Sequence, residues 1–328
     1  MSIAPQGIAW IVTYACNLRC RHCFFDTHPG GDVLRPDTVR WALASLRRPE
    51  DLRWQHLTGG EPMLSLDDVG DILSTFREFA RWDIGIATNG FWADSEATAS
   101  RVVSRLKNGG VTGVCLSADA FHQPAVPVEN IRRAVLAVAE AGLTGHSFVV
   151  SCRLAADSPE ADKINSETDR VLAQLGPVPL PLAPTTLRYL GRGRARGSAQ
   201  EGIPDGPCRD LSCCLGACGP FEPQMVWIDP AGRVMICYGL VIGSIQERTL
   251  QEILDAYRPD GHPVLERLAG RGPIALYELA KEKGWRPSRG FADECDLCYA
   301  SRAFLREVFP AILAPDECYP RVPLCSDA

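Results

Sequence analysis

The strongest constraint on the fold is a regular alternation of strand-like and helix-like segments. Short apolar runs typical of strands occur at residues 8–14, 54–58, 83–88, 113–117, 145–153 and 186–190. Between them, apolar residues recur every three or four positions, which predicts helices at residues 36–48, 66–79, 95–108, 128–141 and 166–175. Such an alternation predicts a parallel α/β sheet with helices outside it. Because six units are fewer than a closed barrel needs, we expect a partial (β/α)6 TIM-like barrel, with its site at the C-terminal strand ends.

The pattern changes after Gly191. Residues 191–207 are rich in Arg, Gly and Pro, which is typical of a connector. Four cysteines follow within residues 208–218, and then a predicted hairpin with strands at residues 225–229 and 233–237. We therefore expect two domains, the partial barrel over residues 1–200 and a small cysteine-rich domain over residues 201–328.

Composition and charge exclude several classes of protein. The chain of 328 residues is 46% hydrophobic and 23% charged, as in soluble globular proteins, and it has no apolar stretch long enough to span a bilayer. It begins without the basic start and cleavage site of a secretory signal. A net charge of −6 argues against a nucleic-acid partner. Fourteen cysteines at short spacings then indicate metal ligands in a reducing cytoplasm, not disulfides.

The first cysteine group directly follows the first predicted strand. Cys16, Cys20 and Cys23 have the spacing C-x3-C-x2-C, and three thiolates at this spacing can hold one iron–sulfur cubane from a short loop. Three ligands for four irons leave one iron open to a small molecule, as a catalytic zinc keeps one open position. A structural zinc loop completed by His22 or His28 is the alternative.

With this loop, residues 1–200 resemble the radical S-adenosylmethionine (SAM) superfamily. The resemblance implies a SAM-binding 4Fe-4S cluster on Cys16, Cys20 and Cys23, whose open iron holds the amino-acid end of SAM. It implies reductive cleavage of SAM to a 5′-deoxyadenosyl radical, which takes a hydrogen atom from a substrate C–H bond. The electron would come from an external donor such as flavodoxin or ferredoxin.

Further segments match SAM-binding motifs of this family, each at or near a predicted strand end or in the cysteine loop. A polar strand end that faces water is the alternative for each. By resemblance they bind the methionine ammonium (Gly59, Gly60, Glu61 and Pro62), the ribose hydroxyls (Ser117 and Asp119), the methionine carboxylate (Arg153), adenine (His22 by stacking and Leu190 through its backbone) and the surroundings of the cofactor (Thr88 and Asn89).

A second cysteine group predicts a second metal centre. Cys218 and Cys237 flank the predicted hairpin, and Cys295 and Cys298 follow; four thiolates are enough to saturate another cubane. This arrangement resembles the twitch domain, the short form of the SPASM extension, and implies one auxiliary 4Fe-4S cluster. The alternatives are a zinc ribbon on the same cysteines, or a further cluster assembled from Cys208, Cys213, Cys214, Cys318 and Cys325.

The remaining residues of interest have two interpretations each. Cys115 and Cys152 lie in predicted strands, as buried small apolar residues do. Three cysteines are candidate hydrogen-atom donors to a substrate radical, namely Cys208, Cys213 and Cys214. The alternative for each is a packing residue or a cluster ligand. Four loop residues are predicted to be solvated, and contact with the substrate is the alternative for each: His122, Arg192, Arg194 and Arg196.

Three functions remain open. In size, the chain resembles twitch enzymes of aminoglycoside and oligosaccharide antibiotic pathways, which implies epimerisation or oxidation of a sugar or aminocyclitol. The second function is epimerisation or crosslinking of a ribosomally made peptide. The third, a non-catalytic iron–sulfur redox protein, is disfavoured by the complete set of cofactor motifs. We expect the first function.

Overall fold

The structure, a computed structural model, describes residues 3–155, 158–196 and 223–319, without the side chains of residues 195 and 196. Its regular elements, in chain order, are β1 (Gly7–Thr13), α1 (Pro36–Ala44), η1 (Pro49–Asp51), β2 (Trp54–Gly59), η2 (Pro62–Leu64), α2 (Leu66–Phe76), β3 (Asp83–Thr88), α3 (Glu96–Gly109), β4 (Gly113–Ser117), α4 (Val128–Glu140), η3 (Thr144–His146), β5 (Phe148–Arg153), α5 (Pro159–Leu175), β6 (Leu182–Thr186), η4 (Gly191–Arg196), β7 (Met225–Ile228), β8 (Arg233–Cys237), β9 (Leu240–Ser244), α6 (Leu250–Ala256), α7 (Leu265–Arg271), α8 (Pro273–Glu282), α9 (Glu294–Leu305) and η6 (Asp316–Cys318).

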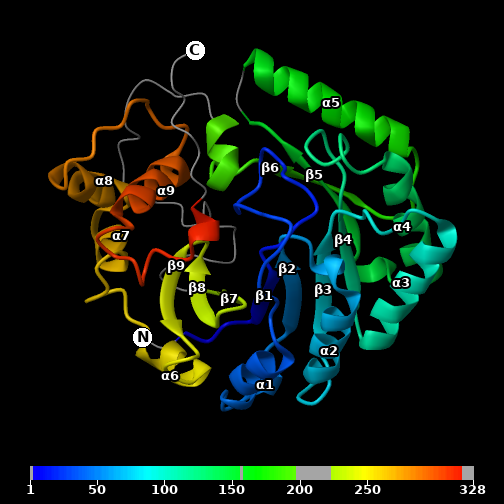
Figure 1. Cartoon of the computed structure of the whole chain (residues 1–328), viewed down its shortest axis with the longest axis horizontal. Coiled ribbons are helices and arrows are strands. Elements are labelled where there is room, and N and C mark those ends of the chain that lie inside the picture. Colours follow the sequence, from blue (N-terminus) through cyan, green and yellow to red (C-terminus); the bar gives the residue numbers. More distant parts are fainter. Residues whose placement is uncertain (1–2, 156–157, 197–222, 320–328) are drawn as a thin grey trace.

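The described strands form one sheet in the order β6-β5-β4-β3-β2-β1-β7-β8-β9. Strands β1 to β6 pair in parallel with their sequence neighbours, and α1 to α5 follow one another around the outside of this half of the sheet (Figure 1). This confirms the predicted parallel α/β fold. Parallel strands end at the same edge, so the loops after β1 to β6 converge there.

β1 is the central strand, and every residue of it is buried. It pairs in parallel with β2 on one side and with β7 on the other. Helices and neighbouring segments cover both faces, which is why its sequence from Ile8 to Val12 is continuously apolar instead of alternating. Within this core the indole of Trp10 donates a hydrogen bond to the side-chain oxygen of Gln55 at 2.8 Å, which pairs the buried indole N–H with the buried amide oxygen.

The predicted sixth strand was placed wrongly. The structure has β6 at Leu182–Thr186, paired with β5, whereas the prediction began at residue 186. As an edge strand, β6 leaves most of its side chains exposed, and its sequence therefore lacks an apolar signal. The apolar residues that suggested a strand, Leu187, Tyr189 and Leu190, are buried in the loop that follows.

Two further predicted elements begin or end elsewhere. Helix α5 begins at Pro159, seven residues before the predicted start, because the Ser158 side chain caps it by accepting a hydrogen bond from the Ala161 amide. The predicted strand at residues 145–153 begins at Phe148, after the short turn η3.

The C-terminal part extends the same sheet. β7 pairs in parallel with β1, and the predicted hairpin, β7 with β8, is antiparallel; β9 completes the edge. Helices α6 to α9 gather on this side of the molecule (Figure 1). Residues from both sides of the predicted domain boundary belong to one hydrophobic core, while the boundary itself at residue 200 lies outside the described residues.

In the part of the chain that the structure describes, no helix combines the length and the apolar character needed to cross a membrane.

The end of β2 packs against the end of β1 with no room for a side chain. A Cβ on Gly60 would lie 2.1 Å from the carbonyl oxygen of Ala15, and one on Gly59, which has φ of +137°, would lie 2.3 Å from that of Thr13. The amides of Gly60 and Glu61 donate to these same carbonyls, of Thr13 and Ala15, at 2.7 and 2.8 Å. The glycine pair therefore sets the position of the chain just before Cys16.

We predict that Gly60→Ala destabilises the protein by about 1–3 kcal/mol, because the new methyl group forces the backbone before Cys16 to move. Thermal unfolding of the metal-free protein measures this. The control is Gly270→Ala, since a Cβ there meets nothing within 4 Å. Equal unfolding temperatures for Gly60→Ala and wild type would contradict the packing argument.

Candidate active site

A cavity of about 300 Å³ lies where the parallel strands end. It brings together most of the residues that the sequence singled out, from four separate strand ends. The predicted residues that line it are Cys16, Cys20, His22, Cys23, Gly59, Gly60, Glu61, Thr88, Asn89, Ser117 and Asp119.

The cysteine loop is shaped by hydrogen bonds to its own sulfurs. The amide of Leu18 donates to Cys16 Sγ at 3.3 Å, and the amide of Phe25 donates to Cys23 Sγ at 3.5 Å. Burial raises the pKa of Cys16 to about 11 and that of Cys20 to about 12. In the metal-free protein these thiols hold their protons, so binding of a metal must displace protons, and the amides stand ready to stabilise the sulfur charge.

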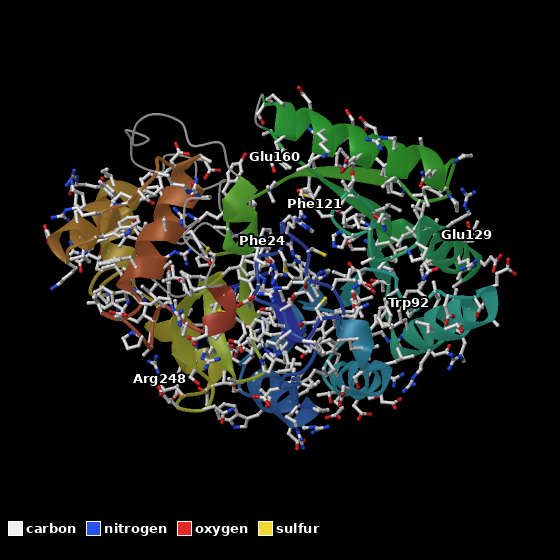
Figure 2. The ribbon with its side chains drawn as sticks, turned by 45° about the horizontal axis from the view of Figure 1, so that its top comes forward. Phe24, Trp92, Phe121, Glu129, Glu160 and Arg248 are labelled. Carbon is white, nitrogen blue, oxygen red and sulfur yellow. The ribbon has the colours of Figure 1, made fainter. Side chains whose placement is uncertain are left out.

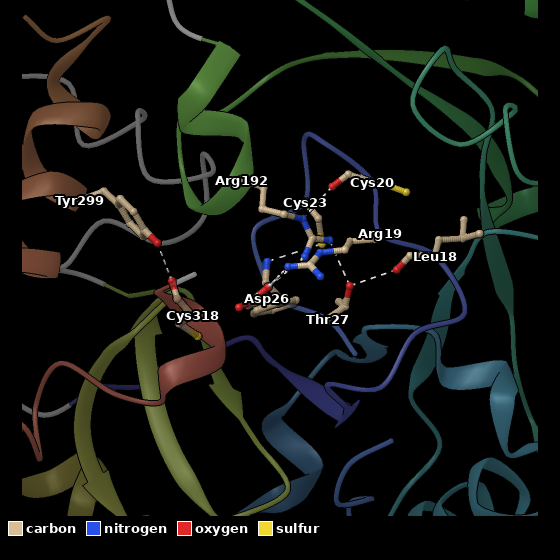
Figure 3. A network of polar contacts seen from close by, with 10 residues as sticks. Leu18, Arg19, Cys20, Cys23, Asp26, Thr27, Arg192, Tyr299 and Cys318 are labelled. Atoms are coloured by element: carbon tan, nitrogen blue, oxygen red, sulfur yellow. Dashed lines mark hydrogen bonds and ion pairs between the residues drawn. The ribbon is translucent and has the colours of Figure 1, made fainter. Parts of the chain in front are cut away.

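Arg192 holds this loop from the opposite side (Figure 3). Its Nε donates to the carbonyl oxygen of Cys20 at 2.9 Å, and its two terminal nitrogens reach Asp26 at 3.3 Å and Thr27 Oγ1 at 3.0 Å. Its own amide donates to the Cys23 carbonyl at 2.9 Å. The prediction that Arg192 is solvated is therefore wrong, because it braces the cysteine loop; it also lines the cavity, so its predicted substrate contact stays a prediction. Arg194 is not solvated either, because it pairs with the buried carboxylate of Asp296.

Glu61 is buried and its carboxylate accepts three hydrogen bonds from the protein. Oε1 accepts from the Met63 amide at 3.0 Å and from Thr88 Oγ1 at 2.8 Å, and Oε2 accepts from the Asn89 amide at 2.7 Å. Asn89 in turn donates through its side chain to Asn17, inside the cysteine loop. Burial raises the pKa of Glu61 to about 7, although these donors oppose the shift. Glu61 thus connects the ends of β2 and β3 and faces the cavity with a carboxyl group that a cation would ionise.

Asp119 is engaged with protein groups on both oxygens. Oδ1 accepts from the amides of Phe121 and His122 and bonds to His122 Nδ1 at 2.9 Å, while Oδ2 accepts from the Cys152 amide at 3.0 Å. Although burial alone would raise the pKa of Asp119, His122 and these hydrogen bonds hold it at about 2. His122 is not the solvated loop residue that the sequence allowed: it orders the Asp119 carboxylate and lines the cavity, and its contact with a substrate stays a prediction.

His22 lies against an aromatic residue of the next loop. Its ring stacks on Phe121 with the centroids 4.5 Å apart, and the ring of His122 meets it edge-on at 4.8 Å. Burial lowers the pKa of His22 to about 3, so the imidazole is neutral, and its buried Nδ1 makes no hydrogen bond. Phe121 and Phe24 both lie toward the middle of the molecule, whereas Glu129 and Arg248 lie at its periphery (Figure 2).

Three predicted residues do not line this cavity: Pro62, Arg153 and Leu190. Arg153 forms an ion pair with Asp169 of α5, and Leu190 is buried in the loop after β6. Other residues on the wall were not singled out for the site, namely Cys152, Arg188 and Tyr238. Cys152 was missed because a cysteine inside a strand predicts only a buried small apolar residue. Arg188 and Tyr238 depend on the true end of β6 and on the pairing of β7 with β1, which no local pattern shows.

The second cysteine group is partly described. Cys237 ends β8 and Cys295 and Cys298 lie in α9, and Arg302 of α9, one turn after Cys298, contacts Cys237 Sγ at 3.8 Å, which brings the two elements together at these cysteines. Burial raises the pKa of Cys298 to about 11, and the guanidinium of Arg302 opposes this rise. Cys318 is buried elsewhere, 4.0 Å from the Tyr14 hydroxyl, with its carbonyl accepting from Tyr299 (Figure 3). The predicted residues Cys208, Cys213, Cys214, Cys218 and Cys325 lie outside the described residues.

The spacing of the sulfurs bears on the kind of metal. Tetrahedral zinc with Zn–S bonds of about 2.3 Å places its sulfurs about 3.8 Å apart. Among the described residues, the one set of three ligand atoms that all lie within 4.8 Å of one another contains no cysteine; it is His22, Asp119 and His122, and the hydrogen bond between the last two accounts for it.

We predict that the metal-free protein loses about 3 kcal/mol of stability, relative to Glu61→Gln, as the pH rises from 4.5 to 7. The sign follows from the raised pKa: the folded state keeps the Glu61 proton, and the unfolded state loses it near pH 4.5. Above pH 7 the difference should stay constant. Denaturant unfolding at several pH values measures it, with Glu247→Gln on the surface as the control. A difference that does not vary with pH would show that Glu61 ionises normally.

Comparisons with known proteins agree with this geometry. Residues 10–152 match the family model described as the Radical SAM superfamily. The chain is 32% identical over 115 residues to molybdenum cofactor biosynthesis protein 1 of Bos taurus, and the aligned residues cover 34% of this chain and 17% of that protein. It is 31% identical over 97 residues to the S-adenosylmethionine-dependent nucleotide dehydratase of Fibrobacter sp. (strain UWH6), and the aligned residues cover 27% of this chain and 29% of that protein. The chain thus matches less than a third of the length of either relative.

A solved structure shares the fold over almost the whole chain. The structure of anSMEcpe with bound AdoMet superposes with a TM-score of 0.55, covering 94% of this chain and 98% of that one, at 12% identity. This likeness includes the C-terminal part, and it shows the fold alone. The matched family model, the cysteine loop and the motifs around the cavity identify residues 10–152 of this chain as a radical SAM domain.

Proposed function

We propose that this protein is a radical SAM enzyme that removes a hydrogen atom from a C–H bond of a hydroxylated small molecule of the sugar or aminocyclitol type, and that it oxidises or epimerises this carbon. The single observation that carries the proposal is the cavity at the strand ends. Its wall joins the three cysteines of one loop to Gly60, Glu61, Asn89 and Asp119 from three other strand ends.

The residues of the wall suit a SAM-bound 4Fe-4S cluster on Cys16, Cys20 and Cys23. Amide donors face two of these sulfurs, and Arg192 holds the loop in shape without taking a sulfur as a partner. When bound, the cluster and SAM would supply a hydrogen-atom acceptor at the cavity, with an electron from a donor such as flavodoxin or ferredoxin. Because such a cluster degrades in air, we place the enzyme in the reducing cytoplasm.

The described residues would hold SAM through complementary groups. Glu61 faces the cavity with a carboxyl group whose pKa is raised to about 7 by burial, and a bound ammonium would favour its ionised form. His22 offers a neutral ring for adenine, and Ser117 lies beside the ordered Asp119. Arg153 takes part only after leaving its ion pair with Asp169.

We propose one auxiliary 4Fe-4S cluster on Cys218, Cys237, Cys295 and Cys298. Its support is that β8 and α9, far apart in sequence, bring Cys237, Cys295 and Cys298 together. Tyr238, which directly follows Cys237, lines the main cavity and packs on Phe24 with ring centroids 4.9 Å apart. A centre attached to the cavity wall is well placed to accept an electron, and this favours oxidation over epimerisation.

The substrate class is argued from the wall of the cavity. Hydroxyl and cationic side chains, of Thr58, Thr186 and Arg188, complete it beside the SAM-binding residues. Such convergent polar groups suit a ligand rich in hydroxyls. Modification of a ribosomally made peptide is the second candidate function. Assays of turnover with sugar-type compounds and with peptides distinguish the two.

We predict that Cys16→Ala, Cys20→Ala and Cys23→Ala together leave about four irons per chain after anaerobic reconstitution, and that formation of 5′-deoxyadenosine from SAM and dithionite is lost. Adding Cys298→Ala should remove the remaining iron. Cys115→Ala, in β4 away from the cavity, is the matched control and should change neither quantity. No iron in the triple variant would refute the auxiliary centre, and about eight would indicate two such centres.

We further predict that turnover in D2O gives a product two hydrogens lighter than the substrate and without solvent deuterium, as oxidation requires. Mass spectrometry of the product measures both. A product of unchanged connectivity that carries one deuterium would instead establish epimerisation. It would direct attention to the thiols of Cys208, Cys213, Cys214 and Cys152 as hydrogen-atom donors.

A further inference from the structure

A buried guanidinium lies beside the second cysteine group. Arg302, on α9 one turn after Cys298, is 1% exposed and is among the largest fully buried side chains described. Long charged side chains are almost never buried to this degree unless a partner of opposite charge or a set of hydrogen-bond acceptors surrounds them. The groups around Arg302 therefore indicate which partner its charge stabilises.

The contacts of Arg302 point to sulfur and to the cavity wall. Its Nη2 donates to Cys237 Sγ at 3.8 Å. Its Nη1 donates to the carbonyl oxygen of Tyr238 at 2.8 Å and to the Tyr319 hydroxyl at 3.3 Å. One side chain thus holds both a cysteine and the residue after it, and that residue lines the main cavity.

Two tyrosines enclose the charge. The rings of Tyr299 and Tyr319 stack on each other with centroids 5.3 Å apart, and each has its centroid 5.9 Å from the guanidinium carbon. All three side chains are buried, so little water reaches them. The guanidinium is protonated at every relevant pH, and in such surroundings its charge acts strongly on nearby groups.

We propose that Arg302 is a positioning residue of the auxiliary centre: it supplies the positive charge and the hydrogen bond that offset the thiolate charge of Cys237 and its cluster, and so raises the reduction potential of that cluster. This inference rests on the auxiliary cluster of the proposed function. It goes further by naming the residue that makes this cluster a better electron acceptor.

The physical reason is charge compensation. Reduction adds one electron to a centre that already carries four thiolates, and a fixed cation nearby favours the more negative form. Hydrogen bonds to cluster sulfurs act in the same direction, and they are strongest where solvent is excluded. Because Arg302 bonds to both Cys237 and the Tyr238 carbonyl, it would hold a cluster ligand at a fixed position relative to the cavity wall.

The test is a redox titration of the full chain carrying Cys16→Ala, Cys20→Ala and Cys23→Ala, so that the auxiliary cluster alone gives the paramagnetic signal. Arg302→Met should lower the equilibrium constant for its reduction at least tenfold, which is about 59 mV for one electron. Arg302→Lys should lower it less, because an ammonium keeps the charge but does not reach both Cys237 and Tyr238 in the same geometry.

Arg306→Met is the matched control. Arg306 lies four residues further along, also contacts the Tyr319 ring at 4.9 Å, and pairs with Asp316, but it has no contact with a cysteine. Its removal should leave the midpoint potential of the cluster unchanged. Iron content and circular dichroism of every variant establish that cluster and fold are retained.

The outcomes separate this inference from the proposed function. A parent triple variant without iron refutes the auxiliary centre itself. An iron-loaded parent whose midpoint potential is the same in Arg302→Met refutes the role of Arg302 alone. Should Arg302→Met not fold, Arg302→Gln, which also removes the charge but keeps hydrogen-bond donors, decides, and a potential equal to that of the parent overturns the inference.

Discussion

The active-site loop is positioned by backbone packing that leaves no room for side chains. Below it, Gly60 lies against the carbonyl of Ala15, and above it a Cβ on Gly191 would lie 2.4 Å from the carbonyl of Phe24. Arg192 then joins both ends of the loop through Cys20 and Asp26. Ordering three thiols around one cluster costs conformational entropy. Rigid backbone contacts that already set the relative positions of these thiols lower that cost more than mobile side chains would.

The same region concentrates ionisable groups whose burial disfavours their charge. Glu61, His22 and the cysteines all have pKa values shifted toward their neutral forms by burial. The neutral forms therefore prevail until a ligand binds. A bound ammonium or metal ion then makes the charged forms favourable. Asp119 is the exception, since His122 and three amides already stabilise its carboxylate. It therefore orders the loop after β4 before any ligand binds.

Sequence patterns predicted the elements with strong periodicity and missed those whose sequence reflects tertiary packing. The helix from Val128 and the central strand from Ile8 follow directly from their apolar spacing. The edge strand β6 was misplaced because its exposed residues lack that spacing, whereas the buried loop after it is apolar. Cys16, Cys20, Cys23 and Glu61 were found because their motifs are local. The bracing role of Arg192 and the place of Tyr238 in the wall were missed because both depend on partners more than a hundred residues away.

The sequence alone determined the fold class, the cysteine loop and the resemblance to the radical SAM superfamily, because each depends on short-range spacing that any matching strand–loop–helix unit repeats. The tertiary structure decided which side chains meet. It attached the C-terminal hairpin to β1, turned Arg192 onto the cysteine loop, engaged Arg153 with Asp169, and buried Arg302 beside Cys237. The reason is physical: an arginine carries the same charge in every sequence context, and only the packing of distant segments selects the group that balances it.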